Sequence, residues 1–176
     1  MKESIIGKKV ILREHRNEDA EFFSYWFNQP KVMFQCGFFE ETTKDEELAA
    51  LNKPEIDCDW YTVTDLSDRI IGEAGLLRIN NKWSCTDMTM IIPNPKDQGK
   101  GYGTEAGKLI LSRAFYHYNM NRVSIGVVGL NEQALKYWEK IGFKKEGIQE
   151  QGYYYNGEYS DFIMMRILKS EYDIIK

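Results

Sequence analysis

The stretch with the clearest chemical meaning is Gln98–Thr104, which reads Gln-Gly-Lys-Gly-Tyr-Gly-Thr and carries three glycines in five residues. Glycine adopts dihedral angles that a Cβ forbids, and it lets the backbone approach a ligand closely. An amphipathic segment follows, so the unpaired N–H groups and the positive dipole end of a helix would point back across this loop. Backbone N–H groups in that arrangement bind anions. The stretch therefore predicts a site for a pyrophosphate.

The glycine spacing excludes two familiar phosphate motifs. A P-loop requires Lys directly after its last glycine, whereas Gly103 is followed by Thr104. The dinucleotide fingerprint requires G-x-G-x-x-G, whereas these glycines recur at every second position.

The flanking segments predict how the loop is held. Thr86–Ile92 is an apolar run typical of a strand, and from Glu105 the apolar residues recur at helical spacing. Arg122–Val128 is again β-branched and apolar, which predicts a second strand. A strand, helix and strand in this order form a right-handed unit with parallel strands. The loop then lies at the carboxyl end of a parallel strand, where open sheets bind ligands.

The first third of the chain is expected to contain one strand and two helices. Lys8–Glu14 reads as the strand, Asn17 is a plausible N-cap of the first helix, and Pro30 is expected to close that helix. Val32–Glu41 is aromatic and reads as irregular. The capping box Thr43–Glu46 predicts a second helix that runs to about residue 51.

The remaining segments alternate between strand and helix patterns. Glycine inside the expected strand Arg69–Arg78 indicates a bulge or a close approach by another backbone. The other expected elements are a strand at Trp60–Asp65, a helix capped by Asn131 and ended by Gly142, and a β-hairpin with a type I′ turn at Asn156-Gly157.

Composition narrows the class of protein. A chain of 176 residues with 43% apolar and 28% charged residues is typical of one globular domain, here residues 1–176. The net charge of −4 argues against nucleic acid as a partner, and no run is long enough for a membrane span. Met1–Ser4 lacks a signal peptide's apolar core, which favours the cytoplasm. The three scattered cysteines suggest neither a disulfide framework nor a metal site.

Several motifs together resemble the GNAT N-acetyltransferase family. Gln98-x-x-Gly101-x-Gly103 is similar to that family's Q/R-x-x-G-x-G/A signature. Further matching pieces follow in order between Asp87 and Leu168, namely N-R-V, N-E-Q-A-L-K-Y-W-E-K-I-G-F, K-K-E-G and Y-Y-Y-N-G-E-Y-S-D-F-I-M-M. The opening strand, "R…N-E-D-A" and aromatic helix resemble the RimJ/RimL-like branch of the family.

The resemblance implies a fold and a co-substrate. The fold is a mixed, mostly antiparallel sheet of about six to seven strands with about four helices and one parallel βαβ pair, an α/β (α+β layered) architecture. The co-substrate is acetyl-CoA, and the reaction is direct acetyl transfer to a primary amine in a ternary complex. The residues expected to hold acetyl-CoA are Ile91, Ile92, Gln98, Gly99, Lys100, Gly101, Tyr102, Gly103, Thr104, Asn131 and Trp138.

The implied reaction needs groups that accept and donate protons. An amine attacks only when unprotonated, and a free alkylamine titrates near pH 10, so a base is expected. Glu73 and Asp87 are the candidates, with a surface carboxylate as the alternative reading of each. In many relatives a tyrosine four residues before the glycine of "GF" is the acid, but here that position holds Trp138, which cannot be one. Tyr137, the candidate acid, is expected at the flank of the inward helix face.

The acceptor is left open at this point. The RimJ/RimL-like features indicate the N-terminal amine of a protein or peptide, as in ribosomal-protein acetylation. A polyamine such as spermidine or spermine is the alternative, although Gly75 and Arg78 stand where carboxylates facing a polycation are expected. A non-catalytic CoA-binding regulator is the third reading, favoured only by Trp138, and a homodimer is a further expectation. Six carboxylates near the expected acceptor site are candidates for meeting a cationic substrate: Glu40, Glu41, Glu46, Glu47, Asp57 and Asp59.

Overall fold

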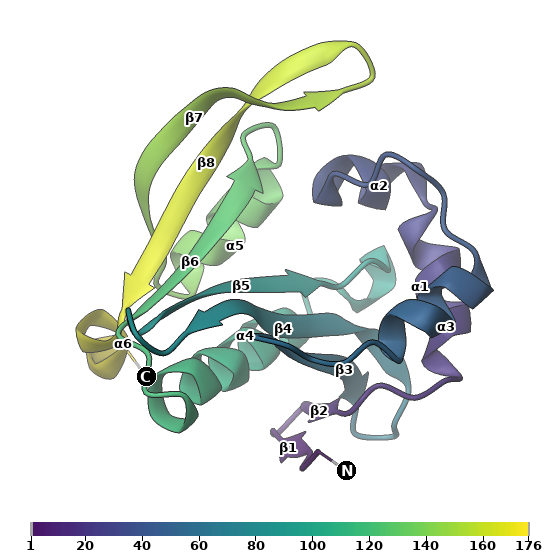
Figure 1. The fold of residues 1–176 in the computed structure, drawn as a ribbon, viewed down its shortest axis with the longest axis horizontal. Coiled ribbons are helices and arrows are strands. Elements are labelled where there is room, and N and C mark those ends of the chain that lie inside the picture. Colours follow the sequence, from purple (N-terminus) through teal and green to yellow (C-terminus); the bar gives the residue numbers. More distant parts are fainter. Residues whose placement is uncertain (1, 176) are drawn as a thin grey trace.

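A computed structural model describes residues 2–175 (Figure 1). In that range, eight strands form one sheet in the order β1-β2-β3-β4-β5-β6-β8-β7, and only β5 and β6 run parallel. The strands are β1 Ile5–Ile6, β2 Val10–Arg13, β3 Asp59–Asp65, β4 Ile70–Asn80, β5 Cys85–Ile91, β6 Arg122–Val128, β7 Lys144–Tyr155 and β8 Glu158–Leu168. The helices are α1 Asp19–Phe27, α2 Pro30–Cys36, α3 Lys44–Leu51, α4 Tyr102–Ser112, α5 Glu132–Lys140 and α6 Lys169–Ile175. Short 3₁₀ and π segments cover Pro95–Asp97 and Arg113–His117.

The mixed, mostly antiparallel sheet with one parallel pair confirms the expected fold. The structure has more elements than expected, because β1 is a two-residue edge strand and because α2 and α6 are additional short helices. Both residues of the Asn156-Gly157 turn have positive φ, as the predicted type I′ hairpin requires. No helix among residues 2–175 is long and apolar enough to cross a membrane.

Three predicted helix boundaries were wrong. Pro30 begins α2 instead of closing the preceding helix, since proline lacks an N–H and its fixed φ also suits a first helical turn. The first half of the segment read as irregular therefore belongs to α2, which ends at Cys36 and is capped by Gly37 with a φ of 73°. Asn17 is not an N-cap, because α1 begins two residues later. Finally, α4 begins at Tyr102 and not near Glu105.

The two faces of the sheet bury different elements. On one face, alternate residues of β2–β5 pack against α4 and include Leu12, Tyr61, Leu76 and Met88, all at most 2% exposed. On the other face a smaller cluster from α1 and α2 packs against Ile91. The face of the sheet that packs against α4 is thus fully buried, whereas the opposite face is only partly covered.

A buried ion pair fixes α1 on the partly covered face. Both oxygens of Asp19 accept hydrogen bonds from Arg13, each at 2.8 Å, and one also accepts the hydroxyl proton of Thr62 at 2.6 Å. Burial opposes ionisation, but the Arg13 and Thr62 hydrogen bonds hold the pKa of Asp19 below its usual value. This attachment sets where α1, and α2 after it, lie over the sheet.

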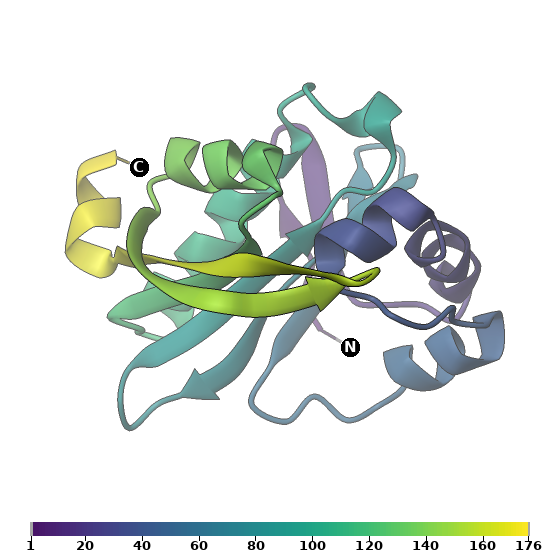
Figure 2. The same cartoon turned by 90° about the horizontal axis from the view of Figure 1, so that it is seen from above.

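The parallel strands β5 and β6 are paired over a short length only and then separate. β5 and β6 pair only through Cys85–Asp87 and Arg122–Ser124, and beyond those residues the two strands diverge (Figure 1). The β7–β8 hairpin rises beside β6, and its tip lies across from α2, as Figures 1 and 2 both show. The diverging strands, the hairpin and α1–α3 thereby surround the region where the glycine loop begins.

Candidate active site

The glycine loop at the start of α4 has the backbone geometry expected of an anion site. Gly99 and Gly101 have φ values of 75° and 88°, in the left-handed region that favours glycine. The first helical hydrogen bond runs from the N–H of Glu105 to the carbonyl of Gly101 at 3.1 Å. The N–H groups of Tyr102, Gly103 and Thr104 precede it and have no acceptor within the helix. They are the donors that a pyrophosphate requires.

Two carboxylates fix this loop from either side. Asp97, which is 3% exposed, accepts two hydrogen bonds from the Arg69 guanidinium at 2.9 and 3.0 Å. Glu105 accepts backbone N–H bonds from Lys8, Lys9 and Val10 at 2.6–2.9 Å and thereby ties α4 to the start of β2. The loop is therefore held at both ends before any ligand binds.

A cavity of about 910 Å³ extends from this loop between the diverging strands. Nine of the eleven expected acetyl-CoA residues line it: Ile91, Ile92, Gln98, Gly99, Gly101, Gly103, Thr104, Asn131 and Trp138. Lys100 and Tyr102 are not among its lining residues. Their expected role is therefore limited to their backbone N–H groups.

Further groups in the cavity suit a phosphorylated ligand. Lys136 and Lys140 of α5 line it, although the sequence reading did not name them. They follow the predicted cap Asn131, whose side chain accepts the N–H of Ala134 at 3.1 Å. Gln98 donates to the carbonyl of Ile92 at 2.8 Å and accepts from Gln133 at 3.0 Å, which joins the loop to β5 and α5. Anionic groups of acetyl-CoA thus fit the donors present.

Tyr137 and Trp138 occupy different faces of α5, as expected from helical phase. Trp138 is 4% exposed and packs edge-on against Phe143 at 5.2 Å between ring centroids. Tyr137 is half-buried in the cavity wall, and its hydroxyl donates to the carbonyl of Gly103 at 2.7 Å. A Cβ on Gly107 would lie 2.5 Å from that hydroxyl oxygen, so a glycine there makes room for the tyrosine. Burial raises the pKa of Tyr137, and its proton is engaged with the backbone of α4.

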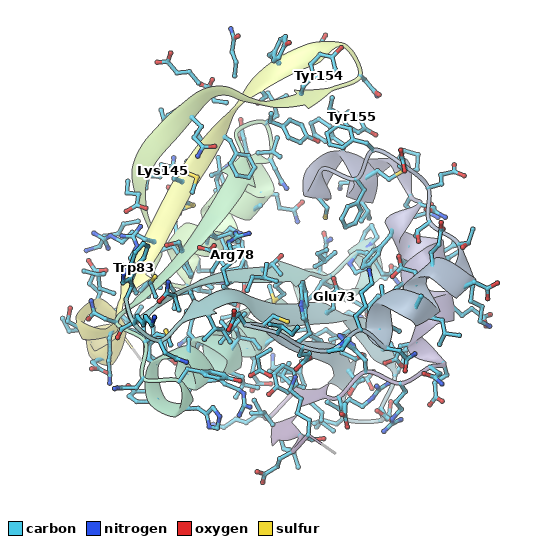
Figure 3. The ribbon with its side chains drawn as sticks, viewed as in Figure 1. Glu73, Arg78, Trp83, Lys145, Tyr154 and Tyr155 are labelled. Carbon is cyan, nitrogen blue, oxygen red and sulfur yellow. The ribbon has the colours of Figure 1, made fainter. Side chains whose placement is uncertain are left out.

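Glu73 lies on the cavity-facing side of β4 (Figure 3). The preceding Gly72 allows a close backbone approach, since a Cβ there would lie 2.0 Å from the carbonyl oxygen of Ile91. Burial, with a smaller effect from the charge of Glu47, raises the pKa of Glu73 to about 8. A carboxylate with that pKa is matched to accepting a proton from an ammonium near neutral pH.

Asp87, the other candidate base, is placed elsewhere. It pairs with Leu77 of β4, four residues beyond Glu73, so the two carboxylates lie on the order of 13 Å apart. Arg78 donates to Asp87 at 2.5 Å, and Asp87 is not among the residues that line the cavity. Of the two candidate bases, only Glu73 lines the cavity together with the residues expected to hold acetyl-CoA.

The acceptor side of the cavity is mainly aromatic and apolar. The rings of Phe38, Phe39, Trp60, Tyr153 and Phe162 line it, and we call these five residues the aromatic wall. Glycines make room for two of them, since a Cβ on Gly75 would lie 2.8 Å from the Trp60 ring and one on Gly126 would lie 2.0 Å from Phe162. The sequence reading identified the aromatic segment at 32–41 but not the pairing of it with the hairpin.

Two of the six acidic residues expected near the acceptor, Asp59 and Glu46, are engaged elsewhere. Asp59 is buried and ion-paired with Lys2 and Arg113. Glu46 closes the predicted capping box with Thr43. Glu47 lies close enough to Glu73 for its charge to raise the pKa of Glu73.

Comparison with known proteins identifies the family. The sequence model of the acetyltransferase (GNAT) domain matches residues 9–144, so this chain belongs to the GNAT family. Spermidine N(1)-acetyltransferase of Vibrio cholerae serotype O1 is 28% identical over 156 residues, which cover 89% of this chain and 85% of that protein. The Escherichia coli K12 protein of the same name is 27% identical over 158 residues, covering 89% and 78%.

Structural similarity agrees with the sequence match. The crystal structure of spermidine N-acetyltransferase from Vibrio cholerae, in complex with CoA and spermine, superposes with a TM-score of 0.86 at 26% identity. The match covers 94% of this chain and 99% of that one. The chain is thus an N-acetyltransferase that uses acetyl-CoA, which supplies the acetyl group as a thioester.

Proposed function

We propose that this enzyme acetylates the primary amine of a small molecule, with Glu73 accepting the proton that the amine loses. The single observation that carries the proposal is the position of Glu73, a carboxyl group with a pKa of about 8, between the acetyl-CoA residues and the aromatic wall. A primary ammonium must lose its proton before it attacks, and a base of matched pKa speeds that transfer by about 10²–10⁴-fold. Backbone N–H groups of the diverging strand β5 are the expected partners of the thioester oxygen.

A small acceptor is supported by the closure of the acceptor side. The hydroxyl of Tyr153 donates to the carbonyl of Phe34 at 2.6 Å, which bridges the hairpin to α2. A bridge between these two walls of the acceptor side favours a small molecule over the N-terminus of a folded protein. Spermidine is the acceptor named for the Vibrio and Escherichia relatives, so a polyamine is one candidate within the small-molecule class.

A protein N-terminus is the second candidate acceptor. It follows from the RimJ/RimL-like features of the opening segment, and one relative favours it. A Bacillus subtilis protein named as a putative ribosomal N-acetyltransferase is 36% identical over 76 residues, covering 43% of this chain. The assignment to that branch, a cytoplasmic location and a homodimer stay predictions.

An amine screen tests the proposal. Release of free CoA thiol is measured with acetyl-CoA and a panel of small primary amines, polyamines and short peptides with free N-termini. We expect turnover with small amines and at least tenfold lower kcat/KM with peptides. Turnover restricted to peptides would replace the proposal with the second candidate.

A further inference from the structure

The aromatic wall is reinforced from behind by a cluster of rings that join the hairpin to α2. Tyr153 and Tyr155 stack with centroids 6.3 Å apart, and Phe34 meets them edge-on at 6.2 and 5.4 Å. Phe39 lies within 6.5 Å of both tyrosine rings and is 65% exposed. Figure 3 shows Tyr155 near the hairpin tip, across from α2. These ring contacts hold the aromatic wall in position before an acceptor binds. The exposed surface of Phe39 is available for contact with an acceptor.

Few negative charges face the acceptor. Among the described residues that line the cavity, only Glu73 and Asp97 carry carboxyl groups. Asp97 is held by two hydrogen bonds from Arg69 and directly precedes the glycine loop. The Glu73 carboxyl is assigned to the amino group that is acetylated, whose proton it accepts in the proposed reaction. Neither group is free to neutralise an additional ammonium.

Among the described residues, the elements around the acceptor side add no further carboxyl group to the cavity lining. Glu47 of α3 lies close enough to Glu73 for its charge to raise the pKa of Glu73, but it is not a lining residue. α2, whose Val32, Gln35 and Cys36 line the cavity, contains no Asp or Glu and carries Lys31. Glu40 and Glu41 directly follow Phe39, but both are exposed and neither is among the lining residues. A polyamine would bring two or more ammonium groups, and a buried ammonium without a paired carboxylate is strongly disfavoured. Aromatic ring faces attract one ammonium, which suits an amine with a single charge.

We propose that the acceptor is a primary monoamine whose amino group is attached to an apolar, preferably aromatic, body, and that the aromatic wall selects it. The body covers Phe39 and packs against Tyr153 and Trp60, while the amino group points to Glu73. This inference rests on the proposed acetyl transfer to a small amine. It differs from the acceptor named for the spermidine-acetylating relatives.

The first test compares 2-phenylethylamine with spermidine as acceptors of the wild-type enzyme. We expect kcat/KM for 2-phenylethylamine to be at least tenfold higher. An equal or higher value for spermidine would overturn the inference and leave acetyl transfer to a small amine intact. A peptide with N-terminal Phe that outperforms 2-phenylethylamine would overturn the small-molecule proposal. If none of these amines supported CoA release, both the small-molecule proposal and this inference would be overturned.

The second test changes the wall. Phe39→Ala should lower kcat/KM for 2-phenylethylamine roughly tenfold, because the acceptor loses a ring contact, and it should leave the spermidine value within twofold. Tyr159→Ala is the matched control, since Tyr159 on β8 is a ring of similar exposure (66%, against 65% for Phe39) and is not among the lining residues. Equal losses for both amines in Phe39→Ala would show that the ring supports the fold and does not select the body, which overturns the proposal.

The third test adds the missing charge. Gln35 lines the cavity from α2, and Gln35→Glu keeps its shape while supplying a carboxylate. This variant should raise kcat/KM for spermidine at least threefold relative to 2-phenylethylamine. An unchanged ratio in a folded Gln35→Glu enzyme would mean that carboxylate number does not control acceptor choice, and the inference would fail.

Discussion

At the scale of single residues, the chemistry depends on Glu73 and on which protonation state it adopts. Glu73→Gln should lower kcat by about 100-fold or more, since general-base catalysis contributes 10²–10⁴-fold. In the wild type, kcat should rise with pH through about 8 as Glu73 ionises, and the glutamine variant should lose that dependence. Asp87→Asn is the matched control, because its exposed pairing with Arg78 is outside the cavity. If Asp87→Asn lost kcat while Glu73→Gln stayed active, Asp87 would be the base and Glu73 would not.

The same residue should leave a signature in stability. The pKa of Glu73 in the folded protein, about 8, exceeds the ordinary value of 4.5, so the folded state binds more protons between these values. The Glu73 contribution to the free energy of unfolding is therefore fully present below pH 4.5 and falls as pH rises through 8. Thermal unfolding should show Glu73→Gln more stable than wild type at pH 8.5, by at least about 2 °C, with a smaller difference at pH 5. The reverse order would contradict the raised pKa.

Tyr137 tests whether this enzyme uses a side-chain acid. Because its hydroxyl donates to Gly103, Tyr137→Phe should cost about 1 kcal/mol of unfolding free energy or CoA affinity, the net value of one hydrogen bond. We expect kcat to stay within tenfold, and Trp138→Phe to behave in the same way. Steady-state kinetics beside calorimetric CoA binding separates the effects. A thousandfold loss of kcat with intact CoA affinity would make Tyr137 the acid.

At the scale of elements, acetyl-CoA binding is expected to depend on the backbone conformation at the start of α4. Gly101→Ala forces a side chain into a φ of 88°, which costs about 1–3 kcal/mol, and its Cβ would lie 3.1 Å from the ammonium of Lys9. Acetyl-CoA affinity should fall about tenfold or more. Gly147→Ala on β7 is the control, since a Cβ there meets nothing within 4 Å. Unchanged calorimetric affinity in Gly101→Ala would refute the pyrophosphate assignment.

Local signals account for the elements that were predicted correctly. The capping box at Thr43, the Asn131 cap and the Asn156-Gly157 turn each involve only neighbouring residues, so the sequence alone reveals them. Pro30 was misread because proline both ends helices and begins them, and no local pattern separates the two. The attachment of the aromatic wall to α2 was not predictable for another reason. Tyr153 and Phe34 lie 119 residues apart, and only the hairpin brings them together.

In the candidate site, too, the residues of a local motif could be predicted, whereas those brought together by strand pairing could not. Seven of the eleven residues expected to hold acetyl-CoA follow one another from Gln98 to Thr104, and that motif, with the family resemblance, was enough to name them. The separation of Glu73 from Asp87 required the register of β4 on β5, which sequence does not give. The aromatic rings over Gly75 and Gly126 likewise depend on which strands are neighbours.

At the scale of the whole molecule, ligand binding should appear as thermal stabilisation. A ligand at 100 times its Kd adds about 2.7 kcal/mol to the free energy of unfolding, or about 5–10 °C in Tm for a chain of this size. We expect that shift with acetyl-CoA and a much smaller one with ATP, which shares the adenosine and phosphates but lacks the pantetheine arm that the diverging strands accommodate. Equal shifts would indicate a general nucleotide site.

The short pairing of β5 with β6 affects how rigid the sheet is. Within residues 2–175, three residue pairs are the only ladder between β1–β5 and the β6–β8–β7 group, so the sheet can flex along that line. A ligand lodged between the strands would stiffen it by bridging both sides. Deuterium uptake in peptides covering 88–92 and 125–128 should therefore drop on adding acetyl-CoA, while β3 exchanges as before. Uniform protection of all strands would mean that the sheet already behaves as one stiff body. With the expected pattern, the enzyme is two half-sheets that become one elastic unit only while the co-substrate is bound.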